Sequence, residues 1–201
     1  ILGIRGSGKT YSATYIAECL MDIGIPVVAI DPVGVWHNLK IANPNGGKSY
    51  PVVVVGKGGD VPLSVDTIEE VTRLMLRNHT SFVVDLFDES LSKSDWDEIV
   101  TKITKILLQE NKVYGLRHIF FEEAAEFVHQ HGKKTEASEW IERLVRMAGN
   151  VQVGCTFINQ RSEQLSKAVL ELSDGLFLHR QKGRLSIKAI QKWLDSANVE
   201  L

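Results

Sequence analysis

The feature that most constrains the fold is a glycine-rich stretch at the start of the chain, Gly3-Ile-Arg-Gly-Ser-Gly-Lys-Thr10. It fits G-x-x-x-x-G-K-[ST], the pattern of a phosphate-binding loop (P-loop) whose backbone N–H groups cradle phosphate oxygens. We expect its three glycines to adopt positive φ angles, so that these N–H groups point inward. Lys9 supplies a positive charge for the β- and γ-phosphates, and the hydroxyl of Thr10 suits a Mg²⁺ ligand.

The residues around this stretch favour the same interpretation. Ile1 and Leu2 are typical of a strand end, and apolar residues recur at helical spacing after Thr10. A strand, a loop and a helix N-terminus would then meet at one anion site, with Lys9 at its surface. The residues expected to contact ATP are Arg5, Gly6, Ser7, Gly8, Lys9, Thr10 and Tyr11.

Length and composition suit one α/β domain covering residues 1–201. The hydrophobic content of 44% is enough to bury a sizeable core. A net charge of −2 gives no bulk signature of a nucleic-acid binder, so any DNA contact has to come from a local patch. Because the chain does not begin with Met and the strand before the P-loop is already ending at Leu2, we expect further residues upstream.

Cysteine usage and hydropathy favour a cytoplasmic protein. Cys19 and Cys155 show no metal-ligand spacing and are expected to be small reduced residues of the core. No signal peptide or run of about eighteen apolar residues is present, so we expect no contact with a membrane.

Short apolar runs alternate with amphipathic segments, which predicts a mostly parallel central sheet with helices on both faces. Strands are expected at residues 25–30, 51–55, 81–86, 117–121, 152–158 and 175–179, with a last hairpin or strand pair within 185–190. Helices are expected after Thr10, after the capping boxes Asp66-x-x-Glu69 and Ser94-x-x-Asp97, at residues 137–148 and at residues 162–172. A turn cluster is expected at residues 43–49.

Two of the predicted strands end in acidic residues, one in Asp85 and the other in Glu122-Glu123. Hydrolysis of ATP needs one carboxylate to support Mg²⁺ and another to orient and deprotonate water. Only the second strand supplies both, and successive strand residues point in different directions. We therefore assign Glu122 to the metal, together with Thr10, and Glu123 to the water. The alternative is an ordinary acidic first turn of a helix.

Two further strand ends carry polar residues. Asp31 can either approach the nucleotide or form a turn with Pro32, and the sequence favours neither. Asn159-Gln160-Arg161 follow another strand and should lie at the sheet edge of the P-loop, where Gln160 can sense the γ-phosphate.

Arg143 and Arg146 share the polar face of the helix predicted at residues 137–148. Glu139 and Glu142 stand four residues before them, a spacing typical of surface ion pairs on helices. The pattern alone therefore indicates two exposed pairs.

Several motifs in this order carry a family resemblance: the P-loop, Ile30-Asp-Pro-Val-Gly34, Val83-Val-Asp-Leu86, Ile119-Phe-Phe-Glu-Glu-Ala124, and Phe157-Ile-Asn-Gln-Arg161 followed by Leu165-Ser-Lys167. Together they resemble the HerA-like branch of the HerA/FtsK ATPases. The resemblance implies a RecA-like core, ATP hydrolysis with Mg²⁺, a homo-oligomeric ring that is usually a hexamer, and motor work on double-stranded DNA. It also implies an arginine that reaches into the ATP site of a neighbouring subunit. The position most similar to that arginine is Arg146, with Arg143 as the alternative.

Three positions depart from the family's pattern. Glu122-Glu123 stand where Asp-Glu is common, which lengthens the metal-side arm by one methylene. Ser162 stands where proline is frequent, and residues 149–152, before the sensor strand, are uncharged where a basic stretch is common.

Three functional classes follow. The first is a ring-forming ATPase motor on double-stranded DNA, in repair, packaging or defence, with a nuclease or effector as partner. The second is a nucleotide-gated scaffold that activates a bound effector without translocating. The third is a P-loop kinase acting on a small molecule, which the paired carboxylates and the absence of an arginine-rich lid segment disfavour.

Overall fold

A parallel β-sheet forms the centre of the molecule. The computed structural model describes residues 1–41, 48–130 and 133–196. Its sheet has five strands in the order β2-β3-β1-β4-β5, and every neighbouring pair is parallel. The strands are β1 (Val27–Asp31), β2 (Val52–Val55), β3 (Ser81–Asp85), β4 (Arg117–Phe121) and β5 (Val153–Phe157). The predicted α/β fold with a parallel sheet is thereby confirmed.

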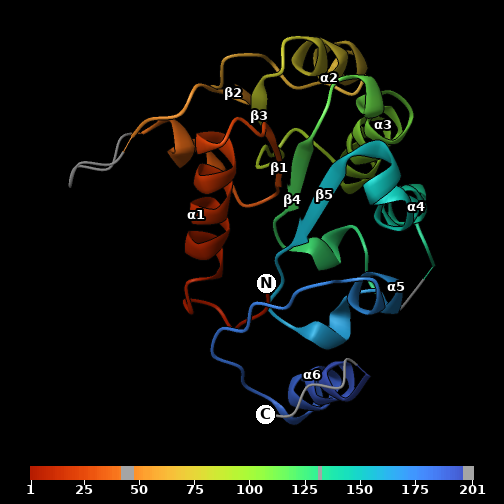
Figure 1. Cartoon of the computed structure of the whole chain (residues 1–201). Helices are drawn as coiled ribbons and strands as arrows, with labels where there is room; N and C mark the ends of the chain where they lie inside the picture. Colours follow the sequence, from red (N-terminus) through yellow and green to blue (C-terminus); the bar gives the residue numbers. More distant parts are fainter. Residues whose placement is uncertain (42–47, 131–132, 197–201) are drawn as a thin grey trace.

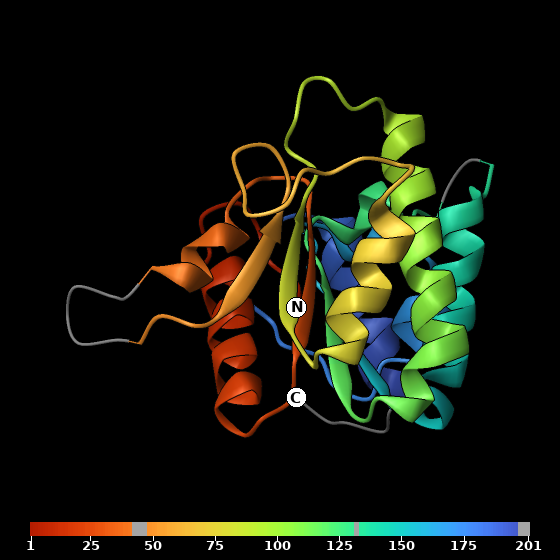
Figure 2. The same cartoon turned by 90° about the horizontal axis from the view of Figure 1, so that it is seen from above.

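Helices cover both faces of this sheet, as predicted (Figure 1, Figure 2). One face carries α1 (Lys9–Asp22) and the 3-10 helix η1 (Trp36–Lys40), and the other carries α2 (Ile68–Arg77), α3 (Lys93–Glu110) and α4 (Glu136–Val151). The larger apolar core lies under α2, α3 and α4, and a smaller one lies under α1. Because both faces are covered, the strands are nearly continuous apolar runs rather than alternating ones.

The starts of α2 and α3 differ from the predicted capping boxes. Ser92 and Asp95 cap α3 reciprocally, in place of Ser94 and Asp97. The N-cap of α2 is Thr67, which makes no side-chain capping hydrogen bond. For α3, two overlapping residue pairs, Ser92/Asp95 and Ser94/Asp97, fit the capping-box pattern. The backbone geometry at the start of the helix decides which pair forms the cap.

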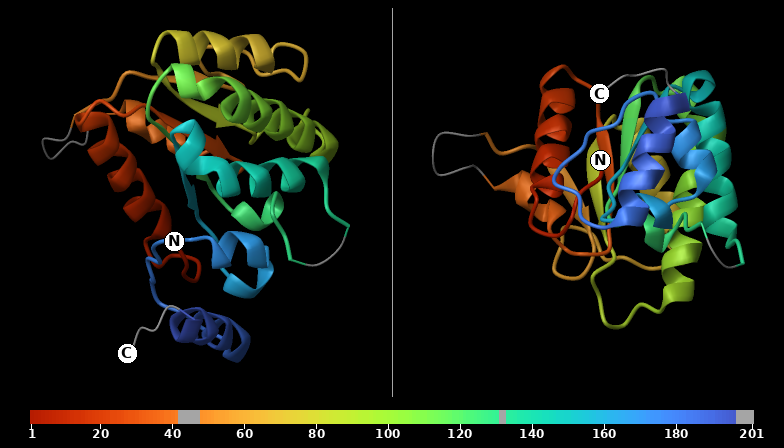
Figure 3. Two further views of the ribbon diagram at one scale, coloured as in Figure 1. Left: turned by 45° about the vertical axis from the view of Figure 1, so that its right-hand side comes forward. Right: turned by 90° about the horizontal axis from the view of Figure 1, so that it is seen from below.

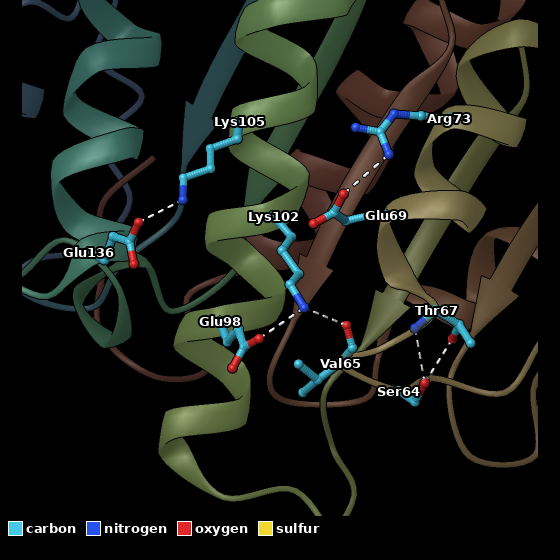
Figure 4. Close-up of polar contacts among 9 residues, drawn as sticks. All are labelled: Ser64, Val65, Thr67, Glu69, Arg73, Glu98, Lys102, Lys105 and Glu136. Atoms are coloured by element: carbon cyan, nitrogen blue, oxygen red, sulfur yellow. Dashed lines mark hydrogen bonds and ion pairs between the residues drawn. The ribbon is translucent and has the colours of Figure 1, made fainter.

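Ion pairs cross the outer surface of the α2–α4 layer (Figure 4). Lys102 contacts Glu98 at 2.8 Å and donates to the carbonyl oxygen of Val65 at 2.9 Å. Lys105 contacts Glu136 of α4 at 2.6 Å. Exposed pairs of this kind stabilise a fold by only about 0–1 kcal/mol each. The layer is therefore held mainly by the apolar faces of its helices.

The segment after β5 departs most from the prediction. The helix expected at residues 162–172 is split into a 3-10 turn, η4 (Ser162–Gln164), and a short helix, α5 (Lys167–Glu171). The strand expected at residues 175–179 is reduced to one parallel bridge between Leu178 and Leu2.

The strand pair predicted within residues 185–190 is wrong, because these residues belong to α6 (Arg184–Ser196). Ile190 and Leu194 are buried on one side of that helix, whereas Leu185 and Ile187 are exposed. A short apolar run fits both a strand and a helix, and burial at a spacing of four residues is what selects the helix.

The two cysteines are free, and only one of them lies where it was expected. Cys155 is half-buried in β5, but Cys19 is exposed on α1, so its predicted place in the core is wrong. The reason is that α1 turns Ala13 and Ala17 toward the sheet, which leaves Cys19 on its outer side.

Two observations complete the description. Residues 43–47 of the predicted turn cluster lie outside the described residues. Within the described ranges, no helix combines the length and the apolar character that crossing a membrane requires.

Candidate nucleotide-binding site

The P-loop leaves the plane of the sheet at Leu2. This residue bridges in parallel to Asn159, just after β5, and to Leu178. The loop then enters α1, which begins at Lys9 with Gly8 as its N-cap and has no side-chain capping bond among the described residues. The first N–H groups of a helix lack intrahelical acceptors and carry partial positive charge. The predicted strand, loop and helix N-terminus therefore converge, and this end of α1 suits an anion.

Two of the three glycines adopt the predicted conformation. Gly6 and Gly8 have φ angles of 72° and 94°. Gly3 does not have a positive φ, so that part of the prediction is wrong. A Cβ atom at Gly3 would lie 2.5 Å from Ser7 Oγ and 2.6 Å from His179 Cβ. Close packing is thus what requires a glycine at this position.

Lys9 is only 6% exposed, which corrects the expectation that it lies at the surface of the site. Its Nζ donates to the carbonyl oxygen of Ile4 at 3.4 Å. An ammonium group has three donors, so the remaining ones suit phosphate oxygens. Arg5 and Tyr11, which were also expected to contact ATP, are exposed on either side of the loop.

Glu122 faces the start of α1 and is 3% exposed. Its Oε1 accepts a hydrogen bond from Thr10 Oγ1 at 3.1 Å, and its Oε2 accepts one from Trp36 Nε1 at 3.0 Å. Burial raises the pKa of Glu122 to about 7, while these two hydrogen bonds oppose the rise. A bound divalent cation would favour the charged carboxylate.

The residues at this point fit Mg²⁺. Mg²⁺ is commonly held by one or two carboxylates together with phosphate oxygens and water, and not by an all-protein cage. The hydroxyl of Thr10 and the carboxylate of Glu122 supply two hard oxygen ligands in hydrogen-bond contact. No cluster of three or more His, Cys, Asp or Glu side chains suited to a metal occurs in the described part of the chain.

Glu123 points away from Glu122, toward the end of β5. Its Oε1 accepts a hydrogen bond from Gln160 Nε2 at 2.7 Å. The backbone of Glu123 is left-handed, with φ 44° and ψ 52°, a conformation that costs a non-glycine residue about 1–3 kcal/mol. Such strain concentrates at functional sites. Here it gives the two adjacent carboxylates the separate surroundings that were predicted, but the cause is a turn after β4 and not the alternation of strand residues.

Asp31 forms a turn, which decides between the two alternatives left open by the sequence. Its two carboxylate oxygens accept four hydrogen bonds from the backbone N–H groups of residues 33–36, at 2.6 to 3.0 Å. The closed turn places Trp36, which packs on Phe120 with ring centroids 5.0 Å apart. Asp31 therefore acts on the site through the position of the Trp36 indole, and its negative charge also contributes to the raised pKa of Glu122.

Arg143 and Arg146 lie on the outer side of α4. The side chain of Arg146 is 60% exposed, and its Nη2 lies 3.7 Å from Glu142 Oε2. The guanidinium of Arg143 lies 5.1 Å from the centroid of the Trp140 ring. Among the described residues, neither arginine makes a hydrogen bond or ion pair with the P-loop. The structure thus brings the other candidate residues together but leaves these two outside the site of their own chain.

Glu142 is more than the surface partner that the spacing suggested. Its side chain is 4% exposed, and its carboxylate also accepts hydrogen bonds from Lys134 at 2.6 Å and from Ser166 at 2.5 Å. Glu142, the partner of Arg146, is therefore held in place by several contacts, and it joins α4 to Ser166 in the segment after β5.

Two residues of the site were missed by the sequence analysis, Trp36 and His179. His179 Nδ1 donates to the carbonyl oxygen of Ser7 at 2.8 Å, and Ile4 N donates to the carbonyl oxygen of Arg180 at 2.9 Å. His179 is 172 residues from Ser7 in sequence. No local pattern reports a contact over such a separation, and none reports the direction of the Trp36 indole.

Comparison with known proteins supports the fold. No protein-family model and no curated protein matches the chain. The chain is similar to the genome packaging NTPase B204 from Sulfolobus turreted icosahedral virus 2 in complex with AMPPCP, with a TM-score of 0.62 at 15% identity over 98% of this chain and 81% of that chain. The same NTPase in complex with ATP-gammaS gives a TM-score of 0.62 at 16% identity over 98% and 80%.

B204, the DNA-packaging ATPase from Sulfolobus Turreted Icosahedral Virus, gives a TM-score of 0.59 at 15% identity over 98% of this chain and 81% of that chain. At these identities the likeness establishes the fold alone. The five-stranded parallel sheet and its covering helices thus have the same fold as these NTPases.

Proposed function

We propose that the protein is an ATP-hydrolysing motor of the HerA-like branch that assembles into a ring, most simply a hexamer, and acts on double-stranded DNA. The observation that carries the proposal is the convergence of Lys9, Thr10, Glu122, Glu123 and Gln160 at one edge of the sheet. The fold likeness to NTPases described as DNA-packaging enzymes supports duplex DNA as the substrate.

In this proposal the P-loop binds the phosphates of ATP. The N–H groups at the start of α1 and the ammonium of Lys9 hold the β- and γ-phosphates. Thr10 and Glu122 hold Mg²⁺, which when bound neutralises phosphate charge and orients the γ-phosphoryl group. The indole of Trp36 fixes the Glu122 carboxylate from the other side, at 3.0 Å.

Glu123 orients the attacking water and accepts its proton. A carboxylate within hydrogen-bond reach of that water is what general-base catalysis requires. Gln160 holds Glu123 at 2.7 Å and lies at the end of β5, where it also senses the γ-phosphate. The separate surroundings of Glu122 and Glu123 support this division of roles.

Arg146 completes the site of a neighbouring subunit. It is exposed on α4, and its contact with Glu142 is long, at 3.7 Å. A guanidinium that enters the site of the next subunit stabilises the charge that develops on the transferred phosphoryl group. Arg143 is the alternative for this role.

Three measurements on the full chain test the proposal: native mass, ATP turnover, and turnover with added duplex DNA. We expect a ring of several copies whose turnover rises with duplex DNA and is lost in Lys9→Ala. A ring that hydrolyses ATP without responding to DNA would identify a scaffold. A single copy with no DNA response would overturn the ring motor altogether.

A further inference from the structure

The C-terminal part of the chain concentrates positive charge. Residues 175–194 contain five Lys and Arg and no Asp or Glu, whereas residues 1–160 contain sixteen Lys and Arg against twenty Asp and Glu. The five cations are all exposed. We call them the basic strip: Arg180, Lys182, Arg184, Lys188 and Lys192. Because a net charge of −2 gives no overall attraction to DNA, any contact with DNA needs a local basic patch. The basic strip is such a patch.

Three members of the basic strip form a row on α6. Arg184, Lys188 and Lys192 are four residues apart, a spacing of about 6 Å along a helix axis. They lie on the side opposite Ile190 and Leu194, which are 8% and 6% exposed. The row is therefore directed away from the protein, on a rigid element.

The other side of α6 is fixed by hydrogen bonds to η4 and α5. Trp193 Nε1 donates to the carbonyl oxygen of Leu170 at 2.8 Å. Ser186 Oγ donates to Glu163 at 2.7 Å, and its carbonyl oxygen accepts from Ser162 Oγ at 3.1 Å. The side of α6 that carries Ser186, Ile190 and Leu194 is thus packed within the molecule.

Within residues 1–41, 48–130 and 133–196, no member of the basic strip forms an ion pair, unlike many cations of the helix layer. The ten ion pairs found among the described residues all lie between Asp22 and Arg146. Figure 4 shows Lys102 in contact with Glu98 and the carbonyl oxygen of Val65, and Lys105 in contact with Glu136. No acidic side chain in the described part of the chain forms an ion pair with a residue of the basic strip. Five unpaired cations on one surface repel each other, and a phosphate backbone would relieve that repulsion.

We infer that the basic strip contacts the phosphate backbone of double-stranded DNA, an inference that rests on the proposed function. A duplex carries about one negative charge per 1.7 Å of its axis, so a row of cations about 6 Å apart can meet several phosphates. Contacts to phosphates position a protein on DNA but carry no sequence information. The strip therefore suits a motor that moves along any sequence.

A membrane surface is the other anionic partner for a basic helix, and the structure disfavours it. Helices that lie on a membrane bury their apolar face among the lipid headgroups. In α6 Ile190 and Leu194 are packed against the rest of the chain, which leaves Leu185 and Ile187 as its exposed large apolar side chains.

The basic strip is joined to the P-loop by the residue that precedes it. The segment between α5 and α6 passes beside the start of the chain (Figure 1, Figure 3). There His179 N donates to the carbonyl oxygen of Leu2 at 2.8 Å, and its Nδ1 donates to Ser7. Because the next residue, Arg180, belongs to the strip, DNA bound there acts on the loop that holds the phosphates. Through this contact we expect bound duplex DNA to raise ATP turnover.

The test measures binding of a fluorescent duplex to the full chain by anisotropy, over a range of salt concentrations. The variant is Arg184→Gln/Lys188→Gln/Lys192→Gln. Its matched control, Lys48→Gln/Arg77→Gln/Lys112→Gln, removes three exposed cations near the opposite edge of the sheet, at the starts of β2, β3 and β4.

We expect the first variant to bind the duplex at least about tenfold more weakly, with a salt slope smaller by about one per removed charge. Its basal ATP turnover should be unchanged and its stimulation by DNA lost, while the control behaves as wild type. The conservative variant Arg184→Lys/Lys188→Arg/Lys192→Arg should keep its affinity. If the glutamine variant does not fold, Lys188→Glu alone provides the same comparison.

Equal binding by variant and control would overturn this inference and leave the proposed function standing. A wild-type chain that neither binds the duplex nor responds to it would instead remove the DNA-motor proposal, and this inference with it. Binding of wild type, but not of the variant, to vesicles with about 30% phosphatidylserine, with duplex binding unchanged in both, would assign the strip to a membrane surface.

Discussion

Two strands of the sheet, β3 and β4, end in acidic residues, yet their ends have different surroundings. At the end of β4, Glu122 contacts the P-loop through Thr10 at 3.1 Å. At the end of β3, Asp85 accepts a hydrogen bond from Phe87 N at 2.9 Å and lines a cavity of about 540 Å³ with His37 and Lys57. Burial raises the pKa of Asp85 as it does that of Glu122. Burial of an acid at a strand end therefore does not distinguish the two.

The position of each strand in the sheet makes the difference. The order β2-β3-β1-β4-β5 places β1 between the two acidic strands, and the P-loop residue Leu2 bridges to Asn159 just beyond β5. One strand, β5, therefore separates the end of β4 from the P-loop. Three strands, β1, β4 and β5, separate the end of β3 from it. The Asp31 turn lies between the two ends and places Trp36 against Glu122.

The largest expected effect comes from the P-loop itself. Lys9→Ala should abolish ATP turnover and leave the circular dichroism spectrum unchanged, because Lys9 is the cation proposed to hold the β- and γ-phosphates. Lys57→Ala, which removes an exposed lysine from the loop after β2, is the matched control and should turn over normally. Normal turnover in Lys9→Ala would contradict the assignment of this end of the sheet as the ATP site.

The next effect tests whether a neighbouring subunit completes the site. Arg146→Ala should lower turnover by about 10³-fold, the scale reported for arginines that act across an interface. Mixing it with Lys9→Ala should restore activity, because some interfaces then combine an intact Lys9 with an intact Arg146. Full activity of Arg146→Ala would leave this arginine as a partner of Glu142 only, and loss without rescue would indicate a role within its own chain.

Glu123→Gln tests whether the acid at the end of β4 activates the attacking water. It should bind ATP with Mg²⁺ but hydrolyse it at least about a hundredfold more slowly, as expected for loss of a general base. Single-turnover hydrolysis and nucleotide binding, measured separately, check this. A normal rate in this variant would show that water is activated elsewhere.

A smaller effect is expected from the residue that supports Glu122. Trp36→Phe keeps the aromatic packing on Phe120 but removes the indole hydrogen bond, so the Mg²⁺ concentration for half-maximal turnover should rise about tenfold. Turnover at saturating Mg²⁺ should stay within a few-fold of wild type. An unchanged Mg²⁺ requirement would mean that this hydrogen bond does not orient the metal-side carboxylate.

The smallest effect is expected at the end of β3. Asp85→Asn should turn over ATP within about twofold of wild type, since Asp85 has no contact with the P-loop among the described residues. Steady-state kinetics of Asp85→Asn and Glu123→Gln, measured side by side, compare the acidic ends of β3 and β4 most directly. If Asp85→Asn were the inactive member of the pair, the acidic strand of the site would be β3.

Much of this molecule was accessible from local pattern. The P-loop, the strands and the helices α1 and α4 depend on spacings within a few residues, which the printed sequence contains. The separation of the Glu122 and Glu123 side chains was predicted from strand geometry, but both residues follow β4, and the left-handed backbone of Glu123 produces it. The register of the α3 cap was not accessible, because Ser92 and Ser94 offer the same pattern two residues apart.

The sequence by itself determined that the chain has a glycine-rich loop of the phosphate-binding pattern, a parallel sheet and two acidic strand ends, because each of these is specified by neighbouring residues. Tertiary structure decided which acidic end faces the loop, that Asp31 closes a turn, and that His179 contacts Ser7. It also made residues 184–196 a helix whose cations are exposed and form no ion pair with the other described residues. These features depend on contacts between residues far apart in the chain, and such contacts exist only once strand order and helix packing bring those residues together.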